Sequence, residues 1–145
     1  MAFNIGEFRS QLGKDGARPN LFEVRMNIPA IVSPGAASRK LTFMAKTAQL
    51  PGSTMGIVPL QYFGREVKLA GNRTFADWSI TVINDEDFEV RNGFERWMNG
   101  LNSHVFNQRN SSFGSATSYT ENATVIQYGK TGAIQKIYAF VGMFP

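Results

Sequence analysis

Apolar and polar side chains alternate along several short stretches of the chain, and this two-residue period indicates strands that bury one face. In the clearest stretch, Phe22, Val24 and Met26 are apolar while the residues between them are polar. Pro29 ends this stretch, because proline cannot donate a ladder hydrogen bond. The alternation, together with short apolar runs, predicts strands over 21–28, 40–48, 60–62, 66–69, 78–83, 123–128 and 133–141.

Glycine-containing pairs punctuate these predicted strands. GKTG at 129–132 separates the last two strands and predicts a β-hairpin turn. Phe63-Gly64 lies between the strands at 60–62 and 66–69, and Gly71-Asn72 is expected to form a further turn.

The period changes to that of a helix after residue 84. Five apolar residues then follow one helical stripe, namely Val90, Phe94, Trp97, Met98 and Leu101. Asn84 is expected to be the N-cap of this helix, which we place at about 85–101. Asp85, Glu86 and Asp87 would occupy its first turn, where each carboxylate favours the helix dipole by roughly 0.3–1 kcal/mol.

The remaining segments are rich in Gly, Pro, Asn and Ser and are interpreted as an arm and loops. The arm covers 1–19, with a turn of helix near Glu7–Leu12, and loops are expected at 29–38, 50–63 and 102–120. Residues 1–145 are then one domain of α+β class, mostly β. The expected architecture is an antiparallel β-barrel or sandwich flanked by one main α-helix.

Composition removes several classes of function. The chain has no cysteine and a single histidine, His104, so neither disulfides nor a His or Cys metal cluster can form. It contains no apolar run of about 18 residues, so no transmembrane helix and no membrane insertion are expected. The N-terminal residues lack the apolar core of a signal peptide, so we expect synthesis and residence inside the cell. The formal net charge of +4 is spread out, unlike the dense basic cluster of a nucleic-acid groove.

Three features suggest chemistry but have simpler interpretations. Consecutive carboxylates at 85–87 point in different directions on a helix, so they are not expected to bind one metal ion. His104 lies in a polar loop without a nucleophile motif, and a surface position is expected. GKTGA at 129–133 lacks the spacing of a phosphate-binding loop. We therefore expect no enzyme activity, no metal and no cofactor, and instead a subunit whose function lies in its interfaces.

The order of motifs resembles the tail tube proteins of contractile-tailed phages of the T-even type, which are related to type VI secretion tube proteins. The matching segments are ARPNLFEV at 17–24, FMAKTAQLPG at 43–52, REVKLAGNRTFADWSITVINDEDFEVRNGFERW at 65–97 and YGKTGAIQKIYAFVGMFP at 128–145. The most specific part is AGNRTFADW followed by an alternating strand and an acidic helix start.

The resemblance implies a structural subunit that forms hexameric rings, which stack into a hollow tube for DNA delivery. Implied partners are other copies of the chain, the tail sheath protein, baseplate and tail-terminator proteins, and DNA passing non-specifically through the lumen. The implied location is the virion, after assembly in the host bacterial cytoplasm. The 50–63 loop and the N-terminal arm would contact the next ring. Expected subunit-interface residues are Arg18, Asn20, Leu50, Pro51, Met55, Ile57, Arg73, Phe75, Asp77 and Trp78.

Within this set, Trp78 is expected to pack. Arg73 and Asp77 are expected to form salt bridges near a subunit boundary or, alternatively, to hold an intramolecular turn together. The resemblance also implies further strands after residue 145 that help to close the barrel. Tube lumens of this family tend to be acidic, whereas this chain is net basic.

Two alternatives to the tube subunit remain open. One is a baseplate–tube junction or initiator protein of the same fold. The other is a small single-stranded nucleic-acid-binding β-barrel that stacks bases on Phe and Tyr, with Phe113, Tyr119 and Tyr128 as candidates that core or interface burial explains more simply.

Overall fold

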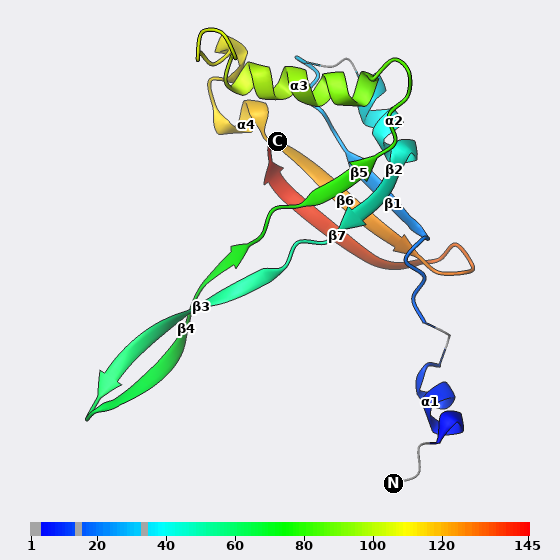
Figure 1. The fold of residues 1–145 in the computed structure, drawn as a ribbon, viewed down its shortest axis with the longest axis vertical. Helices are drawn as coiled ribbons and strands as arrows, with labels where there is room; N and C mark the ends of the chain where they lie inside the picture. The colour runs from blue at the N-terminus through cyan, green and yellow to red at the C-terminus, as the bar shows by residue number, and fades with distance from the viewer. Residues whose placement is uncertain (1–3, 14–15, 33–34) are drawn as a thin grey trace.

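The computed structural model describes residues 4–13, 16–32 and 35–145 (Figure 1). The predicted arm and the loop at 29–38 therefore fall partly outside the described residues. In chain order the elements are α1 (Ile5–Gln11), β1 (Phe22–Met26), α2 (Ala36–Met44), β2 (Ala45–Gln49), β3 (Ser53–Tyr62), β4 (Arg65–Phe75), β5 (Ser79–Val82), α3 (Glu89–Leu101), the 3-10 turn η1 (Ser111–Phe113), α4 (Ala116–Tyr119), β6 (Glu121–Tyr128) and β7 (Ile134–Met143).

The strands form one three-stranded sheet and two two-stranded units, all antiparallel. The larger sheet has the order β1-β6-β7, while β2 pairs with β5 and β3 pairs with β4. The β2–β5 pair crosses the larger sheet, α3 and α2 lie at one end of both, and the β3–β4 hairpin and α1 project away (Figure 1). The expected mostly β, α+β class is confirmed in its sandwich-like form, since the described strands do not close into a barrel.

The core lies between the two crossed layers and the helices. Its buried residues are Met26, Ile28, Ala37, Leu41, Val90, Trp97, Phe113 and Ala123. Half-buried side chains pack against this core, including Trp78 just before β5 and Phe140 of β7. None of the described helices is both long and apolar enough to span a bilayer.

The periodicity of α3 is confirmed by burial, because Val90 and Trp97 are buried and Phe94 and Leu101 are half-buried. Met98 departs from the expected stripe and is 54% exposed. The predicted start of this helix is wrong: α3 begins at Glu89, with Phe88 rather than Asn84 as its N-cap. Lys40 of α2 pairs with Asp85, and Phe88 N–H bonds Asp85 O at 3.1 Å, so a long-range ion pair and a turn occupy 85–88.

Phe88 lies in the left-handed region with φ 50° and ψ 30°, which is costly for a bulky residue. Its side chain is 45% exposed, so little packing is lost on replacement. We predict that Phe88→Asn, which tolerates this conformation, stabilises the protein by about 1 kcal/mol, or roughly 2–4 °C in Tm. Thermal unfolding followed by circular dichroism measures this, with exposed Val105→Asn as the neutral control. A lower Tm for Phe88→Asn would contradict the strain.

Residues 36–44 correct the sequence prediction, which assigned a loop and the first half of a strand there. They form α2, with Ala37 and Leu41 fully buried at a spacing of four residues. Phe43, which lies within the predicted strand 40–48, is 79% exposed at the end of this helix. Burial of Ala37 and Leu41 against β1 and α3 outweighs the alternating pattern of apolar and polar residues in this segment. Strand β2 therefore begins only at Ala45.

The segment 50–63, predicted as an irregular loop apart from a short strand at 60–62, is largely strand β3 in a long hairpin with β4, and the predicted position of Phe63-Gly64 between two strands is confirmed. Phe63 and Gly64 both have positive φ, 45° and 77°, as a two-residue type I′ turn requires. The predicted turn at Gly71-Asn72 is wrong, because both residues lie within β4. Gly71 is needed for close strand approach instead: a Cβ there would lie 3.2 Å from Gly56 O, beside the register shift between Met55 and Ile57.

The last third of the chain follows the prediction more closely. β6 and β7 form the expected hairpin, and the GKTG turn is closed by Gly129 N–H donating to Ala133 O at 2.8 Å. The predicted polar loop 102–120 also contains η1 and α4, and Phe113 within it is fully buried.

Candidate functional site

The chain leaves the body of the protein and returns to it through a short break between two strand pairs. β2 pairs with β5 inside the body, and β3 pairs with β4 outside it. Residues 50–52 and 76–78 join these pairs, and we call them the neck. Pro51 has no N–H to donate, and Ala76 N–H donates to Gly52 O at 3.0 Å. The neck therefore interrupts the hydrogen-bond ladder between the β2–β5 and β3–β4 pairs, while the hydrogen bond between Ala76 and Gly52 keeps its two segments together.

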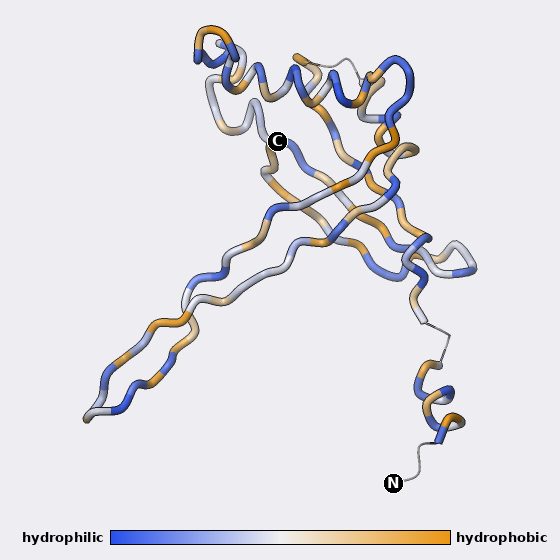
Figure 2. Tube along the Cα trace, viewed as in Figure 1, coloured by the Kyte–Doolittle hydropathy of each residue, from blue (hydrophilic) through white to orange (hydrophobic). Residues whose placement is uncertain are grey.

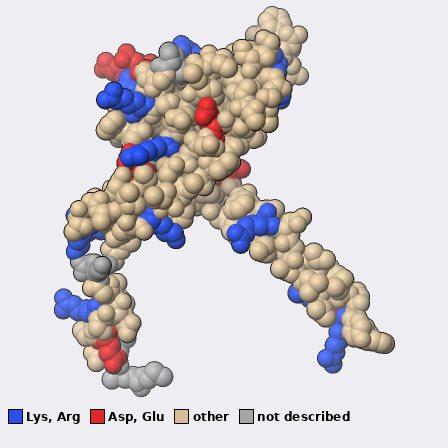
Figure 3. Space-filling model, turned by 180° about the vertical axis from the view of Figure 1, so that it is seen from behind, with Lys and Arg blue, Asp and Glu red and all other residues tan. Residues whose placement is uncertain are grey.

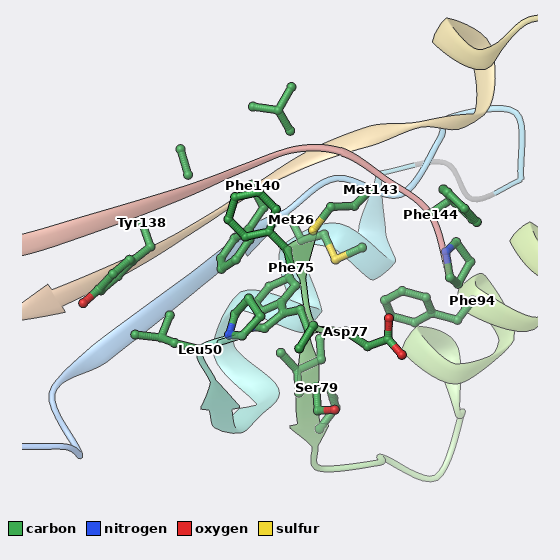
Figure 4. A pocket seen from close by; sticks show the side chains of 18 of the residues that line it. Met26, Leu50, Phe75, Asp77, Ser79, Phe94, Tyr138, Phe140, Met143 and Phe144 are labelled. Atoms are coloured by element: carbon green, nitrogen blue, oxygen red, sulfur yellow. The ribbon is translucent and has the colours of Figure 1, made fainter. Parts of the chain in front are cut away.

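A groove of about 1370 Å³ opens beside the neck. Its walls come from β5, β7 and α3, and the side chains of Phe75, Phe140, Met143 and Phe94 converge on it (Figure 4). The side chains are mainly apolar. Such a volume exceeds the roughly 300–1,000 Å³ of small-ligand pockets, so it suits a polypeptide segment better than a small molecule.

Trp78 connects the neck to the opposite sheet. Its ring stacks on Phe140, with centroids 4.5 Å apart and an interplanar angle of 15°. Its buried indole Nε1 has no hydrogen-bond partner among the described residues. A buried donor without a hydrogen-bond partner costs about 1–3 kcal/mol. Among the described residues, this unpaired donor lies in the wall of the groove.

The β3–β4 hairpin has one apolar face and one mainly polar face beyond the bulge. Cross-strand partners share a face, and the pairs Val58–Leu69 and Leu60–Val67 therefore lie together. These four residues, with Tyr62, make up what we call the apolar ribbon face. The opposite face carries Ile57–Ala70, Pro59–Lys68 and Gln61–Glu66, and Arg65 lies opposite Tyr62 at the end of the apolar ribbon face. Orange and blue segments alternate along the hairpin accordingly (Figure 2).

None of the described residues covers the apolar ribbon face. Val58, Leu60, Val67 and Leu69 are each 47–50% exposed, and Tyr62 is 68% exposed. A two-stranded ribbon is marginally stable in water, and its exposed edges and apolar surface favour association. This face is therefore the candidate interaction surface of the hairpin.

Charge differs between the hairpin and the neck. The hairpin carries Arg65, Lys68 and Arg73 against one acid, Glu66, and Lys and Arg side chains stand out along it (Figure 3). The groove is lined by Asp77 and by Glu95, whose charge is met by Arg91 at 2.8 Å.

Arg73 and Asp77 form no ion pair with each other or with any other described residue. The alternative of an intramolecular turn held by this pair is therefore not observed. Both side chains are exposed.

The structure gathers eight of the ten predicted interface residues on or beside the neck. Five line the groove: Leu50, Pro51, Phe75, Asp77 and Trp78. The other three, Met55, Ile57 and Arg73, lie on the adjoining part of the hairpin. Met55 is opposite Arg73, and Ile57 is just beyond the bulge. Their role at a subunit interface stays a prediction.

Arg18 and Asn20 lie elsewhere, in the exposed segment before β1. The carbonyl oxygen of Arg18 accepts hydrogen bonds from Leu21 N–H at 3.3 Å and from Gln127 Nε2 at 3.5 Å. This segment therefore runs beside β6 rather than beside the groove.

Residues that the sequence interpretation missed complete the site. Phe140 and Met143 form the β7 wall of the groove. Four residues of the apolar ribbon face lie in the predicted short strands 60–62 and 66–69, but Val58 was placed in a loop and the continuous long hairpin was not predicted. A signal was present, because Val58, Leu60 and Tyr62 alternate in the sequence. Because Pro59 and the nearby glycines are typical of loops, they led to the loop prediction for this segment instead.

An ion-pair cluster positions α3, which forms one wall of the groove. Lys40 Nζ contacts Asp85, and it lies 3.0 Å from Glu89 Oε2. The hydrogen bond from Lys40 holds the pKa of the Asp85 carboxyl below its usual value and raises the pKa of Lys40. On the other side of the fold, Arg25 and then Tyr128 lower the pKa of Glu23 by hydrogen bonding.

We predict that Lys40→Met lowers Tm at pH 7 and that this loss disappears in acid. Because the pKa of Asp85 is lower in the folded state, its contribution is present above its unfolded pKa of about 3.9 and vanishes as pH falls through the folded value. Unfolding scans of both proteins between pH 2 and pH 7 measure the difference. Arg91→Met, in an exposed pair, is expected to change stability by less than about 0.5 kcal/mol. An equal deficit at both ends of the pH range would refute the assignment.

The structure shows what lies at the sequence features that suggest catalysis. His104 is exposed, and its backbone N–H donates to Asn99 Oδ1 at 3.1 Å. Among residues 4–13, 16–32 and 35–145, no three His, Cys, Asp or Glu side chains are placed to hold a metal ion.

Comparison with known proteins gives consistent matches. A family model described as phage tail tube protein matches residues 17–145. Tail tube protein gp19 of Enterobacteria phage T4 is 31% identical over 146 residues, covering 99% of this chain and 77% of the relative, and the protein of the same name from Enterobacteria phage T6 matches equally. A tail tube protein of Serratia phage KSP90 is 26% identical over 106 residues, covering 72% of this chain and 60% of the relative.

Proposed function

The chain belongs to the phage tail tube protein family, and from this premise we propose that it assembles with copies of itself into stacked hexameric rings. The stacked rings enclose a conduit through which phage DNA passes. Its role is that of a structural tail tube subunit, a component of the virion, and not that of an enzyme. The tail is of the contractile kind, as the T4 and T6 relatives indicate.

The observation that carries this proposal is the projecting hairpin with an uncovered apolar face. A monomer gains nothing from such an element, whereas a subunit can bury it against a neighbour. The edge strands β1 and β7 have unpaired backbone groups that can join sheets of adjacent subunits into a larger barrel around the lumen. The hairpin and the N-terminal arm then contact the next ring.

The surrounding partners follow from this placement. The outer face of the tube contacts the tail sheath protein, and its ends contact baseplate and tail-terminator proteins. DNA passes through the lumen without specific recognition. Assembly takes place in the host bacterial cytoplasm. The interface includes the predicted residues at the neck and hairpin, with Arg73 and Asp77 pairing between subunits rather than within one.

Sedimentation of the purified protein at increasing concentration tests the proposal. We expect species far larger than the 16.1 kDa monomer, and a monomer at all concentrations would contradict it. The baseplate–tube junction protein of the same fold differs in giving a single discrete ring. A single-stranded nucleic-acid-binding protein would bind oligonucleotides with an affinity that falls steeply with salt.

A further inference from the structure

We propose that the groove beside the neck is the receptor for the apolar ribbon face of a second copy of this chain. The proposal rests on the proposed function only in requiring self-association. It adds which surface receives the hairpin, and which residues meet there.

The two surfaces are alike in chemistry and complementary in form. The ribbon projects apolar side chains from both strands, and the groove is a concave surface lined mainly by apolar side chains, with Phe140 and Met143 on one wall. Each of these half-exposed aliphatic side chains stabilises the contact when it becomes fully buried, because apolar surface is removed from water. Neither surface is covered by residues 4–13, 16–32 or 35–145, so docking removes two exposed apolar patches at once.

One chain cannot make this contact with itself. The hairpin runs in line with the β2–β5 pair and points away from the body, so its apolar ribbon face lies outside the groove of its own chain (Figure 1). The contact therefore joins two different surfaces of two copies. Such a head-to-tail contact generates rings or filaments rather than closed pairs.

Charge supports the same occupant. Asp77 at the groove has no ion-pair partner within the described chain, and Arg73 on the hairpin has none either. A hairpin with three basic side chains and one acid brings positive charge to this carboxylate. Complementary charge of this kind fixes register more than affinity.

Thiol chemistry tests the contact without background, because the chain has no cysteine. One variant carries Leu60→Cys on the apolar ribbon face, and the other carries Ser79→Cys at the groove. The two are mixed under assembly conditions and treated with a short bismaleimide. We expect a covalent dimer of the two variants, formed at least about fivefold faster than with Gln61→Cys, on the opposite face, in place of Leu60→Cys. Equal rates, or no heterodimer, would overturn the proposal.

Tryptophan fluorescence gives a second measure on the unmodified chain. Trp97 is fully buried, whereas Trp78 is half-buried at the groove, so iodide quenching reports on Trp78. We expect assembly to decrease quenching at least twofold. Assembled tubes with unchanged quenching and no cross-link would refute the groove contact while leaving the tube function intact. Absence of any assembly would refute both.

Discussion

Replacing both Leu60 and Leu69 with aspartate is expected to abolish assembly while leaving the monomer folded. Both side chains lie on the apolar ribbon face and are about half exposed in the single chain. Because each leucine is only half exposed before docking, each replacement would lose about 0.8–1.5 kcal/mol of burial in a subunit contact and add an unpaired charge. We expect the concentration needed for assembly to rise at least about 100-fold.

The matched control makes the same change of net charge on the other face of the hairpin. Gln61 pairs with Glu66 and Lys68 pairs with Pro59, so Gln61→Asp with Lys68→Gln lowers the net charge by two units without touching the apolar ribbon face or Ile57. Sedimentation and circular dichroism compare the three proteins. If both double variants assemble equally well, the apolar ribbon face is not a subunit contact. If the leucine variant unfolds, the face serves stability instead.

The largest effect on stability is expected at Trp97. Its side chain is fully buried, its ring stacks with Phe94 at 6.1 Å, and its indole N–H donates to Tyr119 O at 2.9 Å. Trp97→Ala is expected to cost about 3–5 kcal/mol, a large part of the roughly 5–15 kcal/mol that stabilises a domain. Chemical denaturation at pH 7 measures the loss.

A neighbour on the same helix provides the comparison. Met98 is 54% exposed, so Met98→Ala is expected to cost less than about 1 kcal/mol. Similar losses for the two variants would contradict the orientation of α3.

The fold class and α3 could be predicted from the sequence because their signals are periodic and long. The stripe from Val90 to Leu101 spans three helical turns, and the β6–β7 hairpin has a turn signal between two alternating runs. Such patterns reflect burial directly, so tertiary structure preserves them.

Predictions were wrong where a distant residue decides the local structure. The ion pair from Lys40 moves the start of α3 to Glu89, although Asn84 is a good N-cap by itself. Burial of Ala37 and Leu41 makes α2 a helix in a segment that alternates. In both cases the partner residues lie too far away in the sequence for a short window to contain them.

The hairpin was predicted only at its tip, as short strands at 60–62 and 66–69 around Phe63-Gly64, and its full length was missed for a different reason. Its residues satisfy no core within the chain, so a pattern of burial in one subunit cannot explain it. Proline is tolerated in an edge strand such as that of Pro59, and Gly56 and Gly71 allow close approach of the strands at the bulge. In the sequence, however, all three residues are typical of loops. The candidate interface was thus foreseen at the neck through the family resemblance, while its apolar partner surface became visible only in three dimensions.

Negative-stain electron microscopy of the purified chain at high concentration tests the central claim most directly. The account predicts hollow tubes of stacked rings with uniform diameter, which the leucine-to-aspartate variant does not form. A field of single small particles under the same conditions, with the protein folded, would contradict it.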